Sequence, residues 1–183
     1  MIQPHRRWRL WYWEVRTSEQ VEALRQIRNE CREWMTHDQS EITPEQQKEW
    51  WRRIDPNNTF AFLFTEGYNK DFLGFCLLRR EDGRLFTTYG LRKEVRGRRL
   101  GYELVEQATL ACQEDAYADQ LEGNIAVWKA HKAAGWIECY RKNGLIHMYR
   151  PWPQPGDGNN DAEAPARARW LPFLKTSLQE GAQ

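Results

Sequence analysis

The segment from Tyr89 to Val105 passes without interruption from a strand pattern, through a turn rich in glycine and arginine, into an amphipathic helix pattern. A helix that starts at such a turn leaves several backbone N–H groups without helical partners, and its aligned peptide dipoles add partial positive charge there. Arg96, Arg98 and Arg99 bring full positive charges to the same turn. The segment therefore predicts either a site for phosphate or an exposed basic helix start.

The residues before this turn predict an antiparallel meander of three strands. The strands are expected at residues 60–64, 72–78 and 85–91, with turns at 67–70 and 81–83. Gly90 lies inside the third of these strands. A glycine in a strand often marks a bulge or a close approach by another part of the chain.

Helices and further strands are predicted on both sides of the meander. An aromatic strand over residues 8–15 precedes two helices, whose first turns carry the capping pairs Thr17–Gln20 and Thr43–Gln46. The later elements are a helix from Leu100 to near Asp115, a short strand at 120–124, a helix at 125–134 and strands at 136–141 and 145–150. Asn143-Gly144 between the last two strands is the strongest two-residue hairpin signal.

The length and charge of the chain suggest one domain with a local anion site. We expect the domain to cover residues 1–151 of the 183, followed by a Pro-, Gly- and Asp-rich linker and a short apolar tail over 152–183. The chain carries 27 Lys and Arg against 26 Asp and Glu, a net charge of +1. A domain that binds nucleic acid through its overall field is usually far more basic, so this composition disfavours nucleic acid as a partner.

Cysteine spacing and hydropathy indicate the compartment. The four cysteines are scattered, with no C-x-x-C pair and no histidine at ligand spacing, which argues against a metal site or a disulfide framework. The first residues have no apolar signal core, and no stretch is apolar enough to span a bilayer. We therefore expect a cytoplasmic protein that uses neither a membrane nor a metal.

Two motifs relate the chain to a known family. The pattern R/Q-x-x-G-x-G/A falls on R-G-R-R-L-G at residues 96–101, and N-x-x-A-x-x-x-Y-x-x-x-G-F falls on N-I-A-V-W-K-A-H-K-A-A-G-W at 124–136. With the order of strands and helices, they resemble the GNAT superfamily of acetyl-CoA-dependent N-acetyltransferases over residues 8–150. The resemblance implies an α+β fold. Its central sheet would be mixed but mostly antiparallel, flanked by about four helices and splayed between the fourth and fifth strands.

The sequence departs from the family motifs at two positions. Arg99 stands where the first motif has its middle glycine. We expect a negative φ there, as on a first helical turn, so that arginine is tolerated and backbone N–H groups still hold a pyrophosphate. His131 stands where many members carry the tyrosine thought to protonate the leaving thiolate, and phosphinothricin-type members resemble this chain in having histidine. His131 would give that proton as imidazolium or as the neutral N–H tautomer, the alternative being a helix histidine that faces solvent.

The resemblance implies how acetyl-CoA would be held. The strand end from Tyr89 to Leu91 would bind the pantetheine arm through its backbone, and an N–H near Leu91 would polarise the thioester carbonyl. Asn124 would support the arm, and His131 would meet the sulfur. The residues expected to bind acetyl-CoA are Tyr89, Leu91, Lys93, Arg96, Gly97, Arg98, Arg99, Leu100, Gly101, Tyr102, Asn124 and His131.

The acceptor is expected to be a small-molecule amine. The residues from Arg25 onward look similar to the N-terminal stretches of GNAT enzymes that acetylate amino-sugar nucleotides. In that case Arg25 and Arg28 would contact the acceptor's phosphates, and Trp34 would stack on a ring. A general base is needed to deprotonate the amine. Glu122 and Asp82 are candidates, although each could be an ordinary surface carboxylate.

The predicted function is therefore direct transfer of an acetyl group from coenzyme A to a primary amine in a ternary complex, by a monomer or homodimer. A different class of function is a non-catalytic GNAT-fold module that binds acyl-CoA as a sensor or interaction domain. The absence of an obvious base in the fourth strand keeps this alternative open. A third is a protein that binds or modifies nucleic acid through R-G-R-R and its tryptophans, which the near-neutral net charge disfavours.

Overall fold

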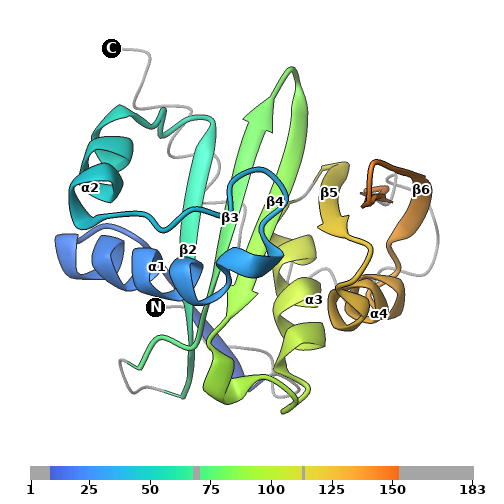
Figure 1. Ribbon diagram of the computed structural model, residues 1–183, viewed down its shortest axis with the longest axis horizontal. Helices are drawn as coiled ribbons and strands as arrows, with labels where there is room; N and C mark the ends of the chain where they lie inside the picture. Colours follow the sequence, from blue (N-terminus) through green and yellow to red (C-terminus); the bar gives the residue numbers. More distant parts are fainter. Residues whose placement is uncertain (1–8, 68–70, 113, 153–183) are drawn as a thin grey trace.

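The described residues, 9–67, 71–112 and 114–152 of the computed structural model, form one seven-stranded sheet in the order β1-β2-β3-β4-β5-β7-β6 (Figure 1). The strands are β1 (Leu10–Glu14), β2 (Thr59–Glu66), β3 (Gly74–Glu81), β4 (Arg84–Leu91), β5 (Ala116–Leu121), β6 (Ile137–Lys142) and β7 (Leu145–Arg150). The helices are α1 (Ser18–Glu30), α2 (Pro44–Arg53), α3 (Leu100–Cys112) and α4 (Ile125–Ala133), with short 3-10 turns η1 (Arg32–Trp34) and η2 (Lys93–Val95). The predicted linker and tail lie, apart from residue 152, outside the described residues.

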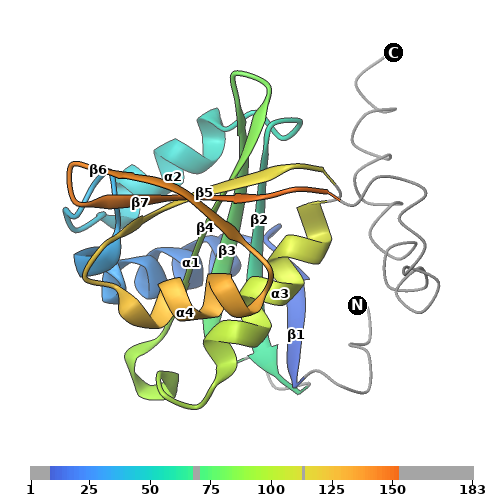
Figure 2. The same ribbon diagram turned by 90° about the vertical axis from the view of Figure 1, so that its right-hand side faces the viewer.

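The sheet opens between β4 and β5. In the described part of the chain, this is the one parallel pair, and it is joined only at Leu85↔Ala116 and Phe86↔Tyr117. Beyond Phe86 the two strands separate, and Figure 2 shows β5, β7 and β6 crossing the direction of β2, β3 and β4. The predicted α+β fold, with a mostly antiparallel sheet splayed between its fourth and fifth strands and flanked by four helices, is confirmed for these residues.

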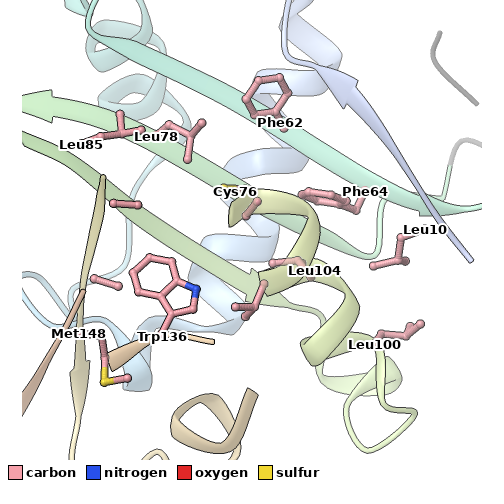
Figure 3. Packing of buried hydrophobic residues seen from close by; sticks show 14 of the residues in the cluster. Leu10, Phe62, Phe64, Cys76, Leu78, Leu85, Leu100, Leu104, Trp136 and Met148 are labelled. Carbon is pink, nitrogen blue, oxygen red and sulfur yellow. The ribbon is translucent and has the colours of Figure 1, made fainter. Parts of the chain in front are cut away.

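Helices cover both faces of the sheet. α1 buries Val21, Leu24 and Ile27 against one face, and α3 packs on the other. Because successive side chains of a strand point to opposite faces, β3 supplies Phe75 to the α1 side and Cys76 to the α3 side. Figure 3 shows the core on the α3 side, where side chains of the sheet meet those of the helix. None of the helices in the described ranges is long and apolar enough to cross a membrane.

Local signals placed several elements correctly. Thr17 and Thr43 each accept a hydrogen bond from the backbone N–H three residues on, and a glutamine at that position completes the capping box. Both early helices therefore begin where they were predicted. Asn143 and Gly144 have φ values of 54° and 76°, the left-handed conformations that a tight hairpin turn between β6 and β7 requires.

The predicted short strand at residues 120–124 was misplaced. β5 covers Ala116–Leu121, and Asn124 instead caps α4, with its Oδ1 accepting from the backbone N–H of Val127 at 3.3 Å. The residues of β5 alternate between buried and half-buried positions. Alanine and aspartate, which make up much of this strand, have weak strand preference. The strand is therefore stabilised by its pairing with β7 and not by its own composition.

Candidate active site

A cavity of about 790 Å³ lies where β4 and β5 separate. The end of β4, the turn before α3, α3, β5 and α4 form most of its wall, and η1 with the loop that follows it forms the remaining side. The predicted site residues that line the cavity are Trp34, Tyr89, Leu91, Arg96, Gly97, Arg99, Gly101, Tyr102, Asn124 and His131. The fold thus brings the two sequence motifs to a single cavity.

Three residues predicted to bind the cofactor lie outside the cavity wall. Leu100 is fully buried in the core. Arg98 forms an ion pair with Glu66 at the end of β2. Lys93 is exposed, and its backbone N–H donates to Oε2 of Glu30 at 3.2 Å. These three side chains therefore do not contribute to the cavity surface.

Arg96 lines the cavity, but its guanidinium already has protein partners. It donates to the carbonyl oxygens of Leu91 at 3.1 Å and Glu30 at 3.0 Å, and it lies 3.4 Å from the carboxylate of Glu33. The thiol of Cys31 donates to the same Leu91 oxygen at 3.2 Å, and burial raises the pKa of this thiol. Arg96 therefore ties α1 and η1 to the end of β4, which fixes one side of the cavity.

Arg25 and Arg28, predicted to contact acceptor phosphates, also lie outside the cavity wall. Arg25 donates to the carbonyl oxygen of Ile42 at 2.9 Å and pairs with Glu22 at 2.6 Å. Arg28 donates to the carbonyl oxygen of Asp38 at 2.5 Å, and burial lowers its pKa. The two arginines hold the loop between α1 and α2 onto α1. This loop carries the η1 side of the cavity.

The cavity wall includes an acidic residue on β5 that was not among the predicted site residues. Glu122 and Asp82, the two candidate bases, are exposed and outside the wall, whereas Asp119 lines the cavity. Oδ1 of Asp119 lies 2.7 Å from Nδ1 of His147 on β7. The pairing depends on the register between β5 and β7, which no turn sequence connects and which hydropathy alone does not specify.

Arg99 has a backbone conformation that differs from the one expected. Its φ is +65°, in the left-handed region, so the predicted negative φ was wrong. α3 begins at Leu100, so Arg99 belongs to the reversing turn and not to the helix. A non-glycine residue in this region costs about 1–2 kcal/mol. The Arg99 side chain is exposed at the cavity and forms no hydrogen bond or ion pair with the described residues.

His131 is buried, with 1% of its surface exposed, so the alternative of a solvent-facing helix histidine was wrong. Its Nδ1 lies 3.1 Å from the carbonyl oxygen of Val127, which can only accept, so Nδ1 carries the ring proton. Nε2 is then an acceptor, and the hydroxyl of Tyr89 donates to it. Burial lowers the pKa of His131 to about 4. The ring is therefore neutral near pH 7, which disfavours the imidazolium as a proton donor.

Gln120 on β5 joins the same group. Its Oε1 lies 3.0 Å from Nδ1 of His131, and the residue lines the cavity. Its Nε2 is buried and has no hydrogen-bond partner among the described residues. Leaving a buried amide donor unsatisfied costs about 1–3 kcal/mol. An acceptor atom of a ligand or a water molecule is therefore expected beside Nε2. No group of three His, Cys, Asp or Glu side chains suited to a metal occurs in the described ranges.

Comparison with known proteins identifies the family. A family model described as Acetyltransferase (GNAT) family matches residues 21–145, which contain both motifs and the cavity wall. The chain belongs to the GNAT family. No curated protein matches the chain by sequence.

Solved acetyltransferase structures share the fold. The spermidine N-acetyltransferase from Vibrio cholerae, in complex with CoA and spermine, has a TM-score of 0.66 at 13% identity, covering 79% of this chain and 96% of that one. A GNAT superfamily phosphinothricin acetyltransferase from Sinorhizobium meliloti, in complex with AcCoA, has a TM-score of 0.66 at 14% identity, covering 82% and 95%. At these identities the likeness establishes the fold alone.

Proposed function

We propose that this GNAT protein transfers an acetyl group from acetyl-CoA to the primary amine of a small molecule, by direct transfer in a ternary complex. The observation that carries the proposal is the cavity between β4 and β5, which has an unpaired strand edge on one side and the unpartnered Gln120 amide on the other. Structures of the same fold from two bacteria hold CoA or AcCoA, which supports acetyl-CoA as the donor.

The residues present suit acetyl-CoA. After Phe86, β4 offers backbone N–H and C=O groups that β5 does not pair, and an amide-containing arm can bond to such groups. A Cβ added at Gly97 would meet nothing within 4 Å, and one at Gly101 would meet only Leu91 Cδ1, at 3.9 Å. This leaves room for phosphate groups at the start of α3, where backbone N–H groups are free. Arg99 would add positive charge there.

The proton for the leaving thiolate would come from Tyr89. His131 is neutral, and its single ring proton is directed at Val127 and Gln120. Tyr89 lines the cavity, and its hydroxyl carries the other exchangeable proton of the pair, which rests in the hydrogen bond to Nε2 of His131 and would turn from there to the thiolate. In this proposal His131 positions the hydroxyl instead of donating the proton itself. General acid catalysis of this kind contributes about 10²–10⁴-fold to a rate.

Calorimetry with acetyl-CoA and CoA tests the binding half of the proposal. Release of free thiol from acetyl-CoA, measured with spermidine, phosphinothricin, kanamycin, lysine and an amino-sugar nucleotide, tests the transfer half. Binding with thiol release on at least one amine is the expected result. Binding without release on every amine would favour an acyl-CoA-binding module, and an absence of binding at high micromolar ligand would exclude both functions.

A further inference from the structure

Asp119 and His147 form a pair at the cavity that the proposed donor site does not use. They lie directly opposite each other in the register of β5 and β7. Asp119 is on the face of β5 opposite Gln120, because neighbouring strand residues alternate. The exposed fractions of the two side chains are 18% for Asp119 and 23% for His147. The ring of Tyr140, on β6, stacks on His147 with the ring centroids 4.2 Å apart.

This arrangement holds the carboxylate in one orientation. A carboxylate oxygen can only accept, so Nδ1 of His147 donates to Oδ1 of Asp119 across 2.7 Å. Stacking on Tyr140 restricts rotation of the imidazole ring. Oδ2 of Asp119 has no partner among the described residues. Asp119 is among the residues that line the cavity and His147 is not, so Asp119 is the member of the pair that lies next to a bound molecule.

We infer that Asp119 receives the acceptor's primary amino group and takes its proton, and that His147 is the positioning residue for this carboxylate. The inference rests on the proposed function. As the neutral amine nitrogen bonds to the thioester carbonyl carbon, one N–H proton passes to Asp119 and the C–S bond breaks. The thiolate takes the Tyr89 proton, and both side chains regain their resting states by exchange with solvent.

The other carboxylates near the cavity are less suited to this role. Glu33 lines the cavity, but its carboxylate lies 3.4 Å from the guanidinium of Arg96, which also bonds to the chain at Glu30. Glu33 therefore belongs to the contact that closes the η1 side. Glu122 lies outside the cavity wall. Both acids of the wall keep one carboxylate oxygen without a partner among the described residues, but the Asp119 side chain is only 18% exposed, against 54% for Glu33, and is therefore held more firmly.

Four variants of the full chain test the inference. Asp119→Asn removes the base while keeping the side-chain shape. His147→Asn keeps an N–H donor close to the position of Nδ1, and His147→Leu removes it. Asp115→Asn is the matched control, because Asp115 lies just before β5 and accepts from the hydroxyl of Tyr149 on β7 at 2.8 Å, but does not line the cavity. The measurements are thiol release with the five amines named above, acetyl-CoA affinity by calorimetry, and thermal unfolding.

Asp119→Asn is expected to lower kcat by about 100-fold or more and to leave the Kd for acetyl-CoA near the wild-type value. His147→Leu should lower kcat by about tenfold or more, since a small misplacement of a reacting group is costly. His147→Asn and Asp115→Asn should both stay near wild type. Because the two His147 variants change the same side chain, comparing their unfolding temperatures separates loss of the donor from loss of stability.

Two results would overturn the inference while leaving the proposed function intact. One is a near-wild-type kcat for Asp119→Asn. The other is equal loss in His147→Asn and His147→Leu at equal stability, which would make the imidazole itself the base. If the wild-type protein binds acetyl-CoA but releases thiol with none of the five amines, both the inference and the proposed transfer fail. Wild-type activity together with an inactive Asp119→Asn variant supports both.

Discussion

The hydroxyl of Tyr89 donates a hydrogen bond to Nε2 of His131, which joins β4 to α4 at the wall of the cavity. In the family that the chain belongs to, many members carry a tyrosine at the position of His131. Here the helix supplies a neutral imidazole, and the phenolic hydroxyl comes from the strand instead. The pair therefore retains a tyrosine hydroxyl at the wall, attached to a different element of the fold.

Tyr89→Phe should lower kcat by about 10²-fold or more if this hydroxyl protonates the thiolate. The Kd for acetyl-CoA should change little, because the strand backbone at this position is unaltered. The variant also leaves the buried Nε2 of His131 without its donor, which should lower the free energy of unfolding by about 1–3 kcal/mol. Thiol release under saturating acetyl-CoA and urea unfolding measure the two effects.

Tyr117→Phe is the control for this prediction, because Tyr117 lies on β5 outside the cavity wall. It removes a hydroxyl of the same kind and should leave kcat unchanged. If Tyr89→Phe keeps the wild-type kcat while His131→Gln loses activity, the acid role would pass back to His131.

The burial of His131 predicts a pH dependence of stability. Its pKa is about 4 in the folded chain, against an ordinary value of 6.5. Between these values the unfolded chain binds the proton and the folded chain does not, so stability rises with pH. The contribution of His131 to the free energy of unfolding is complete above pH 6.5 and is lost as the pH falls toward 4. The free energy of unfolding changes by about 3 kcal/mol over this range. Urea unfolding at pH 7 and pH 4.5 measures it.

His131→Gln separates this contribution from that of other titrating groups. The variant lacks the ring, so its free energy of unfolding should fall less than that of the wild type between the two pH values. Equal falls in the two proteins would show that His131 is not held in the neutral form by burial.

Much of the fold could be predicted because its signals are local. Thr17 and Thr43 mark helix starts through bonds to the third residue on, and Asn143-Gly144 marks a turn through its own conformational preference. β5 was misplaced because its stability comes from pairing with β7, a partner distant in sequence. Local chemistry is visible in a sequence, whereas strand register is not.

In the candidate site, too, local features could be predicted from the sequence, whereas contacts between distant segments could not. The motifs predicted which segments form the cavity, since they specify a turn and a helix. They did not predict that Arg96 bonds to the carbonyl oxygen of Glu30, because this bond depends on how α1 sits beside β4. Nor did they predict the bond from Arg28 to the carbonyl oxygen of Asp38, which depends on how the loop after α1 folds back onto that helix. The φ of Arg99 was missed because this residue was expected to belong to the first helical turn, whereas α3 begins at Leu100 and Arg99 belongs to the turn before it. The Asp119–His147 pair needed the register of two distant strands.

Two variants of Arg99 separate the effect of its backbone strain on stability from the effect of its charge on acetyl-CoA binding. Arg99→Gly should raise the free energy of unfolding by about 1 kcal/mol, because glycine adopts its positive φ without steric cost. Arg99→Ala keeps the strain and should leave stability near the wild-type value. Both variants lose the same charge, so calorimetry should show similar losses of acetyl-CoA affinity in the two. An equal stability of Arg99→Gly and Arg99→Ala would show that the turn carries no strain at this residue.

Gly90→Ala tests the close approach of α1 to β4. A Cβ at Gly90 would lie 2.6 Å from Sγ of Cys31 and 2.8 Å from a ring carbon of Phe75. Both neighbours are buried, so we expect the free energy of unfolding to fall by about 1–3 kcal/mol. Gly101→Ala is the control, because its Cβ would meet only Leu91 Cδ1, at 3.9 Å, and alanine favours a helix by up to about 1 kcal/mol over glycine.

Cys31→Ala should partly suppress the Gly90→Ala defect, since it removes the nearest atom while the contact with Phe75 remains. Residues in direct contact show coupling of about 0.5–3 kcal/mol in double-mutant cycles, so the double variant should be more stable than the sum of the two single changes. Urea unfolding of all four proteins gives this coupling. A strictly additive result would place the defect at Phe75, and the contact between Cys31 and Gly90 would then not set the distance between α1 and β4.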